Sequence, residues 1–192
     1  YEMEIIVVDT GSTDNTKDIV QRYTDKVFDF EWCDDFAAAK NFAISKTSND
    51  YIIMLDSDEY IDKFEESELI RTIGNNSDKA GRIQIKNVFK KTDPCKESRE
   101  WVSRIFNKKS YHYEGRIHEQ IVRYDGKEYD TFQAPVTIIH TGYDLTEKEK
   151  KAKAKRNISL LEKELDRLIK LFCKNNRLNI CEIDGIELVD HI

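Results

Sequence analysis

The chain has 192 residues and a formal net charge of −6, from 37 acidic and 31 basic side chains. This length suits one domain with a small appendage, and the acidic balance argues against a general nucleic-acid-binding protein, which carries a basic excess. Hydrophobic residues make up 39% of the chain and aromatic residues 10%, a composition typical of a globular protein and not of a disordered one. The apolar runs are far shorter than the ~20 residues that a membrane-spanning helix needs.

The cysteines do not form a recognisable metal or redox motif. None of the four belongs to a C-x-x-C pair, which argues against a zinc ribbon or a thioredoxin-like site. Scattered cysteines in a chain of this size are typical of reduced thiols, and no basic-then-apolar leader is visible. These features, together with the short apolar runs, predict a cytoplasmic protein.

The first third of the chain alternates apolar runs with helical patterns. Three strands are predicted, at residues 4–8, 26–30 and 51–55. Two helices are predicted between them, one ending near Tyr23 and one running from Asp34 or Asp35 to Ile44. Buried strands that alternate with helices are typical of a parallel, Rossmann-like α/β sheet. Because the chain opens almost inside a strand, we expect a first strand and helix to be missing.

The remaining pattern predicts a change of architecture. A helix at 63–73 is followed by strands at 81–89, 100–106, 116–122, 127–132 and 136–140. Their alternation indicates an antiparallel or mixed part of the sheet. A helix with an apolar stripe is predicted from Glu147 to about Cys173, and residues 175–192 carry no usable signal. The expected organisation is one α/β domain over residues 1–145 and a helical extension over residues 146–192.

Acidic residues follow two of the predicted strands directly. Asp9 ends the first strand, and Asp56-Ser57-Asp58 follows the third. Ligands of open α/β sheets bind just beyond the carboxyl ends of the strands, and paired carboxylates suit Mg²⁺ or Mn²⁺ completed by substrate phosphates. A D-x-D sequence alone is common, so its place after a buried strand is what favours a metal site.

Several blocks of sequence resemble those of one enzyme family. They are VVDTGSTDNT (7–16), DDFAAAKNFAI (34–44), IMLDSDEYI (53–61), SRIFNKKSYHYEGRIHEQI (103–121), and IIHTGY (138–143) followed by KAKRNISLLEKEL (153–165). In order and spacing they are similar to family 2 glycosyltransferases of the GT-A fold. The last blocks resemble a bacterial subgroup whose members often continue into tetratricopeptide repeats.

This resemblance implies a donor site for a nucleoside diphosphate sugar, most often a uridine-linked one. It implies that Asp9 contacts the nucleobase and that Asp56 and Asp58 bind the metal and the diphosphate. Lys40 stands where the family usually has arginine, so the charge is kept without the fork geometry. His140 corresponds to a third metal ligand, and imidazole favours Mn²⁺ over Mg²⁺. Each of these assignments is an expectation carried by the resemblance.

A base for the acceptor is expected in Gly115-Arg116-Ile117-His118-Glu119. An inverting sugar transfer needs a group that takes the acceptor's proton. Glu119 is the first candidate and His118 the second; on a strand they would point to opposite faces, so only one of them could face the cleft. Arg104 would meet either a phosphate oxygen or a surface carboxylate.

The function expected from these features is metal-dependent, inverting sugar transfer to a polypeptide, a cell-wall polymer or a lipid-linked glycan. One alternative is a phosphatase of the haloacid dehalogenase type, which also has D-x-D after a strand. That class expects Thr or Val where this chain has Tyr60. The other alternative is an inactive module that binds sugar nucleotides or a protein partner.

Overall fold

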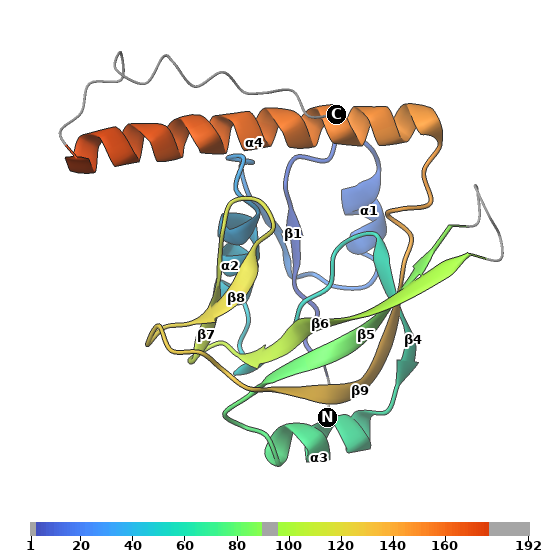
Figure 1. Cartoon of the computed structure of the whole chain (residues 1–192). Helices are drawn as coiled ribbons and strands as arrows, with labels where there is room; N and C mark the ends of the chain where they lie inside the picture. Colours follow the sequence, from blue (N-terminus) through green and yellow to red (C-terminus); the bar gives the residue numbers. More distant parts are fainter. Residues whose placement is uncertain (1–2, 90–95, 177–192) are drawn as a thin grey trace. The chain divides into compact units, whose positions relative to one another are not determined.

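The computed structural model describes residues 3–89 and 96–176, apart from the side chains of residues 173 and 176. The chain divides into two compact units, residues 1–148 and 149–192, and each is described by itself. The first unit contains, in chain order, β1 (Val7–Asp9), α1 (Thr16–Val20), β2 (Val27–Asp29), α2 (Phe36–Ser45), β3 (Tyr51–Ile53), β4 (Glu59–Phe64), α3 (Glu66–Gly74), β5 (Ala80–Val88), β6 (Glu97–Asn107), β7 (Tyr111–Glu114), β8 (Gln120–Arg123) and β9 (Thr131–His140) (Figure 1).

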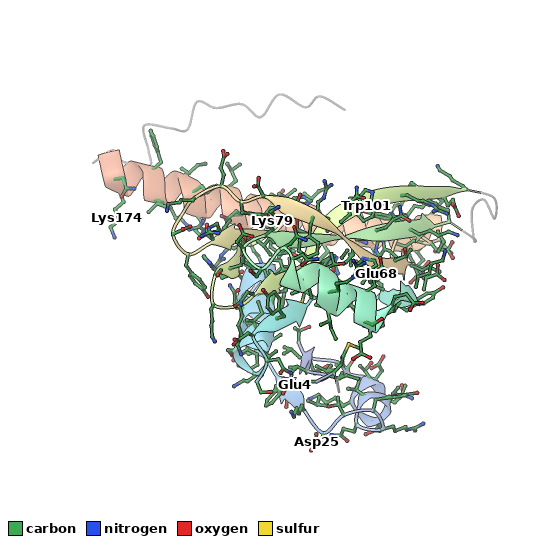
Figure 2. The ribbon with its side chains drawn as sticks, turned by 90° about the horizontal axis from the view of Figure 1, so that it is seen from below. Glu4, Asp25, Glu68, Lys79, Trp101 and Lys174 are labelled. Carbon is green, nitrogen blue, oxygen red and sulfur yellow. The ribbon has the colours of Figure 1, made fainter. Side chains whose placement is uncertain are left out.

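A five-stranded mixed sheet forms the centre of the first unit. Its strand order is β3-β6-β5-β9-β4, and only the β5–β9 pair is parallel. Alternation along the strands places Ile83, Ile105 and Ile138 on the buried face, where each is at most 1% exposed. Leu69 of α3 packs into the same core, and Figure 2 shows α3, with Glu68, alongside the sheet that carries Trp101.

A second core joins α2 to the short hairpin of β7 and β8. Ala37 and Ile44 of α2 pack with Phe106, Tyr111 and Tyr113, all of which are buried. β1 and β2 form a separate parallel pair, and α2 also contacts β1. Helix α2 therefore sits between the N-terminal strand and the hairpin.

The expected α/β architecture, a mixed sheet flanked by helices, is present, but its parallel part is smaller than predicted. β3 does not continue a parallel sheet with β1 and β2; it pairs antiparallel with β6. An apolar run shows that a strand is buried, but it does not tell which neighbour the strand pairs with, because that choice depends on contacts distant in sequence. β4, directly after the D-x-D turn, was not predicted.

Several predicted strand boundaries were wrong. The first strand, predicted at 4–8, is Val7–Asp9, and residues 116–119 form a loop between β7 and β8 instead of part of a strand. In place of the two strands predicted at 127–132 and 136–140 there is one strand, β9, which begins at Thr131 and has Pro135 inside it. The register between β5 and β9 shifts on either side of Pro135, which accommodates a residue that has no backbone N–H to donate.

The described part of the second unit is α4 (Glu147–Asn176), a helix of 30 residues whose first two residues belong to the first unit. About half of the surface of each of its apolar residues Ile158, Leu161, Leu165, Leu168 and Phe172 is exposed. No helix in the described ranges is both long and apolar enough to cross a membrane. Residues 175–192, for which the sequence pattern provides no structural expectation, lie almost entirely outside the described residues.

Candidate active site

The buried face of the central sheet changes from apolar to polar along one row of paired residues. Glu59 of β4 pairs with His140 of β9, His140 pairs with Asn87 of β5, and Asn87 pairs with Ser98 of β6. The pairs before this row, such as Ile85 with Ile138, are apolar. Because side chains on one face recur every second residue, this polar row lies on the same face as the apolar core, at one end of the strands.

Asp58 and His140 meet at the end of this row. His140 Nε2 lies 3.3 Å from Asp58 Oδ2, and both the amide and the hydroxyl of Thr141 donate to the Asp58 carbonyl at 2.9 Å. A Cβ at Gly142 would lie 2.0 Å from Asp58 Oδ2 and 2.4 Å from His140 Nε2. The turn before β4 is thus attached to the end of β9, and only glycine lets the backbone pass so close to the pair.

A chain of alternating charges begins beside this pair. Lys40 Nζ lies 2.6 Å from Glu119 Oε1 and 2.9 Å from Asp56 Oδ1. Arg104 Nη2 lies 2.7 Å from Asp56 Oδ2 and 3.0 Å from Glu59 Oε1. We call these five residues the ion-pair chain; the side chains of its two cations are only 10–11% exposed. Asp56 occupies its middle, between both cations.

Local structure explains how Lys40 and Glu119 reach each other. The Asp35 carboxylate accepts from the Ala38 amide at 2.8 Å and caps α2, which fixes the start of the helix that carries Lys40. One turn of helix further, the Asn41 side chain exchanges two hydrogen bonds with the backbone of Tyr113 in β7. The loop that follows β7 therefore returns beside α2, with Glu119 facing the helix.

The charges of the ion-pair chain shift one another's protonation. Burial opposes ionisation of Asp56, but Arg104 and Lys40 outweigh it and lower its pKa. Burial dominates at Glu59 and raises its pKa, although Arg104 attracts its charge. For Arg104, the two carboxylates outweigh burial and raise the pKa of the guanidinium further. Asp56 is therefore the stably ionised member of the pair of acids at Arg104.

Asp9 occupies a different part of the unit. Its carboxylate is 5% exposed and accepts hydrogen bonds from the amides of Gly11 and Ser12, at 3.2 and 3.1 Å. Lys17 Nζ lies 3.5 Å away, and the Ser12 bonds lower the pKa of Asp9. The carboxylate thus organises the loop that follows β1, and β1 pairs with β2 rather than with the strand that precedes Asp56.

The two acids of the D-x-D motif point to different partners. Asp58 meets His140, whereas Asp56 meets Lys40 and Arg104, which is a buried arrangement and not the surface ion pair considered for Arg104. Within the described ranges, no three His, Cys, Asp or Glu side chains are grouped to hold a metal. Asp58 and His140 fit an ion that takes one or two protein ligands and completes its shell with phosphates.

The two candidate bases, His118 and Glu119, have different surroundings. His118 is exposed and has a positive φ of 56° in the loop, while the side chain of Glu119 is 15% exposed and bonded to Lys40. Because residues 118 and 119 lie in a loop, the alternation expected for a strand does not decide between them. The geometry brings Glu119, and not His118, into contact with the other charged groups.

Sequence reasoning missed two members of this region. Glu59 stands directly beside the D-x-D motif, yet it was not among the predicted site residues. Asn87 was missed as well, although it follows Ile83 and Ile85 at the same spacing. A polar residue at a position where the alternation requires an apolar one was the signal that could have found it.

Comparison with known sequences assigns most of the chain to one family. The family model described as "Glycosyl transferase family 2" matches residues 1–154. The chain belongs to this family. Its first unit is accordingly a family 2 glycosyltransferase domain, with the expected GT-A type of α/β fold.

Individual relatives match this glycosyltransferase domain to different extents. The glycosyltransferase SunS of Bacillus phage SPbeta is 27% identical over 174 residues, which are 84% of this chain and 39% of SunS. A TPR repeat-containing protein of Synechococcus elongatus is 46% identical over 56 residues, 29% of this chain and 14% of that protein. An uncharacterized glycosyltransferase of Haemophilus influenzae is 36% identical over 87 residues, 38% of this chain and 35% of that protein. The chain thus spans well under half the length of these relatives.

Proposed function

We propose that this domain transfers a sugar from a nucleoside diphosphate sugar, uridine-linked, to an acceptor, with a divalent metal ion and with inversion at the anomeric carbon. The observation that carries the proposal is the meeting of Asp58 and His140 at 3.3 Å, beside the ion-pair chain. A carboxylate and an imidazole at the end of a sheet, next to the cations Lys40 and Arg104, suit a metal ion that is bound together with a diphosphate.

The residues of the site would have distinct roles. Asp58 and His140 would hold the ion, Mn²⁺ or Mg²⁺, which when bound neutralises the departing diphosphate. Lys40 supplies a positive charge beside Asp56. When a diphosphate binds, the Lys40 ammonium would contact a phosphate oxygen in place of the Asp56 carboxylate. Asp9, which organises the first loop, would face the nucleobase with that loop. Arg104 is engaged by two carboxylates, so we assign it to holding Asp56 rather than to the donor.

Glu119 is the proposed base. The acceptor oxygen or sulfur attacks the anomeric carbon, the bond from that carbon to the diphosphate oxygen breaks, and the bonding electrons leave with the nucleoside diphosphate. The acceptor proton moves to the Glu119 carboxylate, which Lys40 holds at 2.6 Å. His118 would lie too exposed to be shielded from water during this step. The acceptor is a hydroxyl or thiol of a polypeptide, a cell-wall polymer or a lipid-linked glycan.

Calorimetric titration of uridine diphosphate tests the donor site. Binding is measured in Mn²⁺ and again after EDTA, for the unaltered chain and for Asp58→Asn. Asp62→Asn is the matched control, because Asp62 is an exposed acid in β4 only four residues away. We expect Mn²⁺-dependent binding that is lost in Asp58→Asn and kept in Asp62→Asn.

Two results would contradict the proposal. Binding that persists in EDTA and in Asp58→Asn would show that the donor site does not use a metal ion. Binding that is metal-dependent but never followed by release of uridine diphosphate from a panel of uridine diphosphate sugars would favour the inactive module. In an active domain, Glu119→Gln should keep Mn²⁺-dependent binding and lose this release.

A further inference from the structure

We propose that Asn87 and Glu100 are positioning residues for the metal site, because they hold His140 in the tautomer whose free nitrogen faces Asp58. This inference rests on the metal-dependent function proposed above. It concerns residues that lie on neighbouring strands behind the Asp58–His140 pair and that the sequence motifs do not include.

A relay of hydrogen bonds runs across three strands. His140 Nδ1 lies 2.6 Å from Asn87 Oδ1, and Asn87 Nδ2 donates to Glu100 Oε1 at 2.8 Å and to Ser98 Oγ at 3.3 Å. Asn87 itself is only 3% exposed. Its position is fixed by backbone pairing on both sides, with His140 in β9 and with Ser98 in β6.

The chemistry of the relay fixes each hydrogen. An ionised carboxylate only accepts hydrogen bonds, so Glu100 requires the NH₂ group of Asn87 to face it. The Asn87 amide then presents its oxygen to His140. An amide oxygen also only accepts, so the His140 ring must carry its hydrogen on Nδ1.

The consequence is a free electron pair on His140 Nε2, directed at Asp58. In a neutral ring this atom and Asp58 Oδ2, 3.3 Å apart, are both acceptors, and a cation bound by both satisfies them together. Hydrogen bonds that set the tautomer of a ligating imidazole typically change metal affinity by about 10–100-fold when they are removed. The ring of Tyr143 packs against the imidazole with the ring centroids 4.7 Å apart and the planes at 81°.

Mn²⁺ binding, measured by the loss of the free-ion electron paramagnetic resonance signal, tests this role without any turnover. We expect Asn87→Leu to weaken Mn²⁺ binding about 10–100-fold. Asn87→Asp can still accept from Nδ1 but loses the donor to Glu100, so it is combined with Glu100→Gln, whose amide can donate to the new carboxylate; this double variant should recover most of the affinity. Glu97→Gln is the matched control, since Glu97 is an exposed acid of the same strand as Glu100 and bonds only outside the relay, to Lys86 and Arg99.

A second measurement on the unaltered chain does not depend on how the variants fold. Long-range ¹H–¹⁵N spectra of the metal-free protein should show a hydrogen on His140 Nδ1. A ring with its hydrogen on Nε2 alone, or unchanged Mn²⁺ affinity in a folded Asn87→Leu variant, would overturn the inference. If instead the unaltered chain binds no Mn²⁺ with or without uridine diphosphate, the proposed metal-dependent function itself fails.

Discussion

Replacing Arg104 by methionine removes the cation that Asp56 shares with the buried carboxylate of Glu59. The Arg104 side chain is 10% exposed and that of Glu59 3% exposed. Asp56 keeps Lys40 at 2.9 Å after this change, whereas Glu59 keeps only the Asp56 amide, which donates to it at 2.8 Å. The loss therefore falls mainly on Glu59, which is left as a buried charge without a counter-ion.

The expected cost is large and depends on pH. Removing one partner of a buried ion pair destabilises a protein by about 3–5 kcal/mol. Burial already raises the pKa of Glu59 above its usual 4.5, and losing Arg104 raises it further. The folded variant then keeps a proton above pH 4.5 that the unfolded chain has lost, so its stability falls as pH rises through the raised pKa.

Urea unfolding at pH 8 and at pH 5 measures this cost. We expect Arg104→Met to lose about 3–5 kcal/mol at pH 8 and less at pH 5, where Glu59 can be neutral. Adding Glu59→Gln should restore part of the stability at pH 8, because it removes the unpaired charge and keeps an acceptor for the Asp56 amide. Equal losses at both pH values, with no recovery in the double variant, would refute the role given to Glu59.

Three further changes test other contacts. Lys26 and Ser48 hold the pKa of Glu4 at about 2, so the destabilisation of Glu4→Gln, seen in urea at pH 6, should shrink as pH falls from 4.5 towards 2. Gly142→Ala would put a Cβ 2.0 Å from Asp58 Oδ2; it should weaken Mn²⁺ binding with little change in thermal midpoint, and unchanged binding would contradict this. Asp35→Ala removes the cap of α2 and should cost about 1 kcal/mol in urea.

The sequence was sufficient to predict the alternation of strands and helices at the start of the chain, because residues 5–8 and 51–55 are continuously apolar and the second helix begins at a cap residue, Asp35. It was not sufficient to predict how the strands pair. β3 pairs with β6, about fifty residues later in the chain, and nothing local to residues 51–53 encodes that partner. Pro135 illustrates the same difficulty, since a bulge lets β9 continue where a break was expected.

The candidate site was predicted in part, for a similar reason. Asp58 and His140 were expected together on the resemblance alone, and the structure brings them to 3.3 Å. The link from Lys40 to Glu119 depends on the Asn41–Tyr113 backbone contact between α2 and β7. A contact between residues so distant in sequence leaves no periodic signal, so the ion-pair chain became visible only in three dimensions.

The different surroundings of the two D-x-D acids lead to a final prediction. Asp56 is held by two cations, so an added metal ion must compete with them, whereas Asp58 faces one imidazole. We therefore expect Asp58→Asn to abolish Mn²⁺ binding in the absence of nucleotide. Asp56→Asn should keep that binding, because its main effect is to free Lys40 and Arg104. Paramagnetic resonance titrations of both variants give the comparison. Loss of Mn²⁺ binding in Asp56→Asn alone would contradict this assignment, because it would mean that the D-x-D turn rearranges and that Asp56, not Asp58, binds the ion.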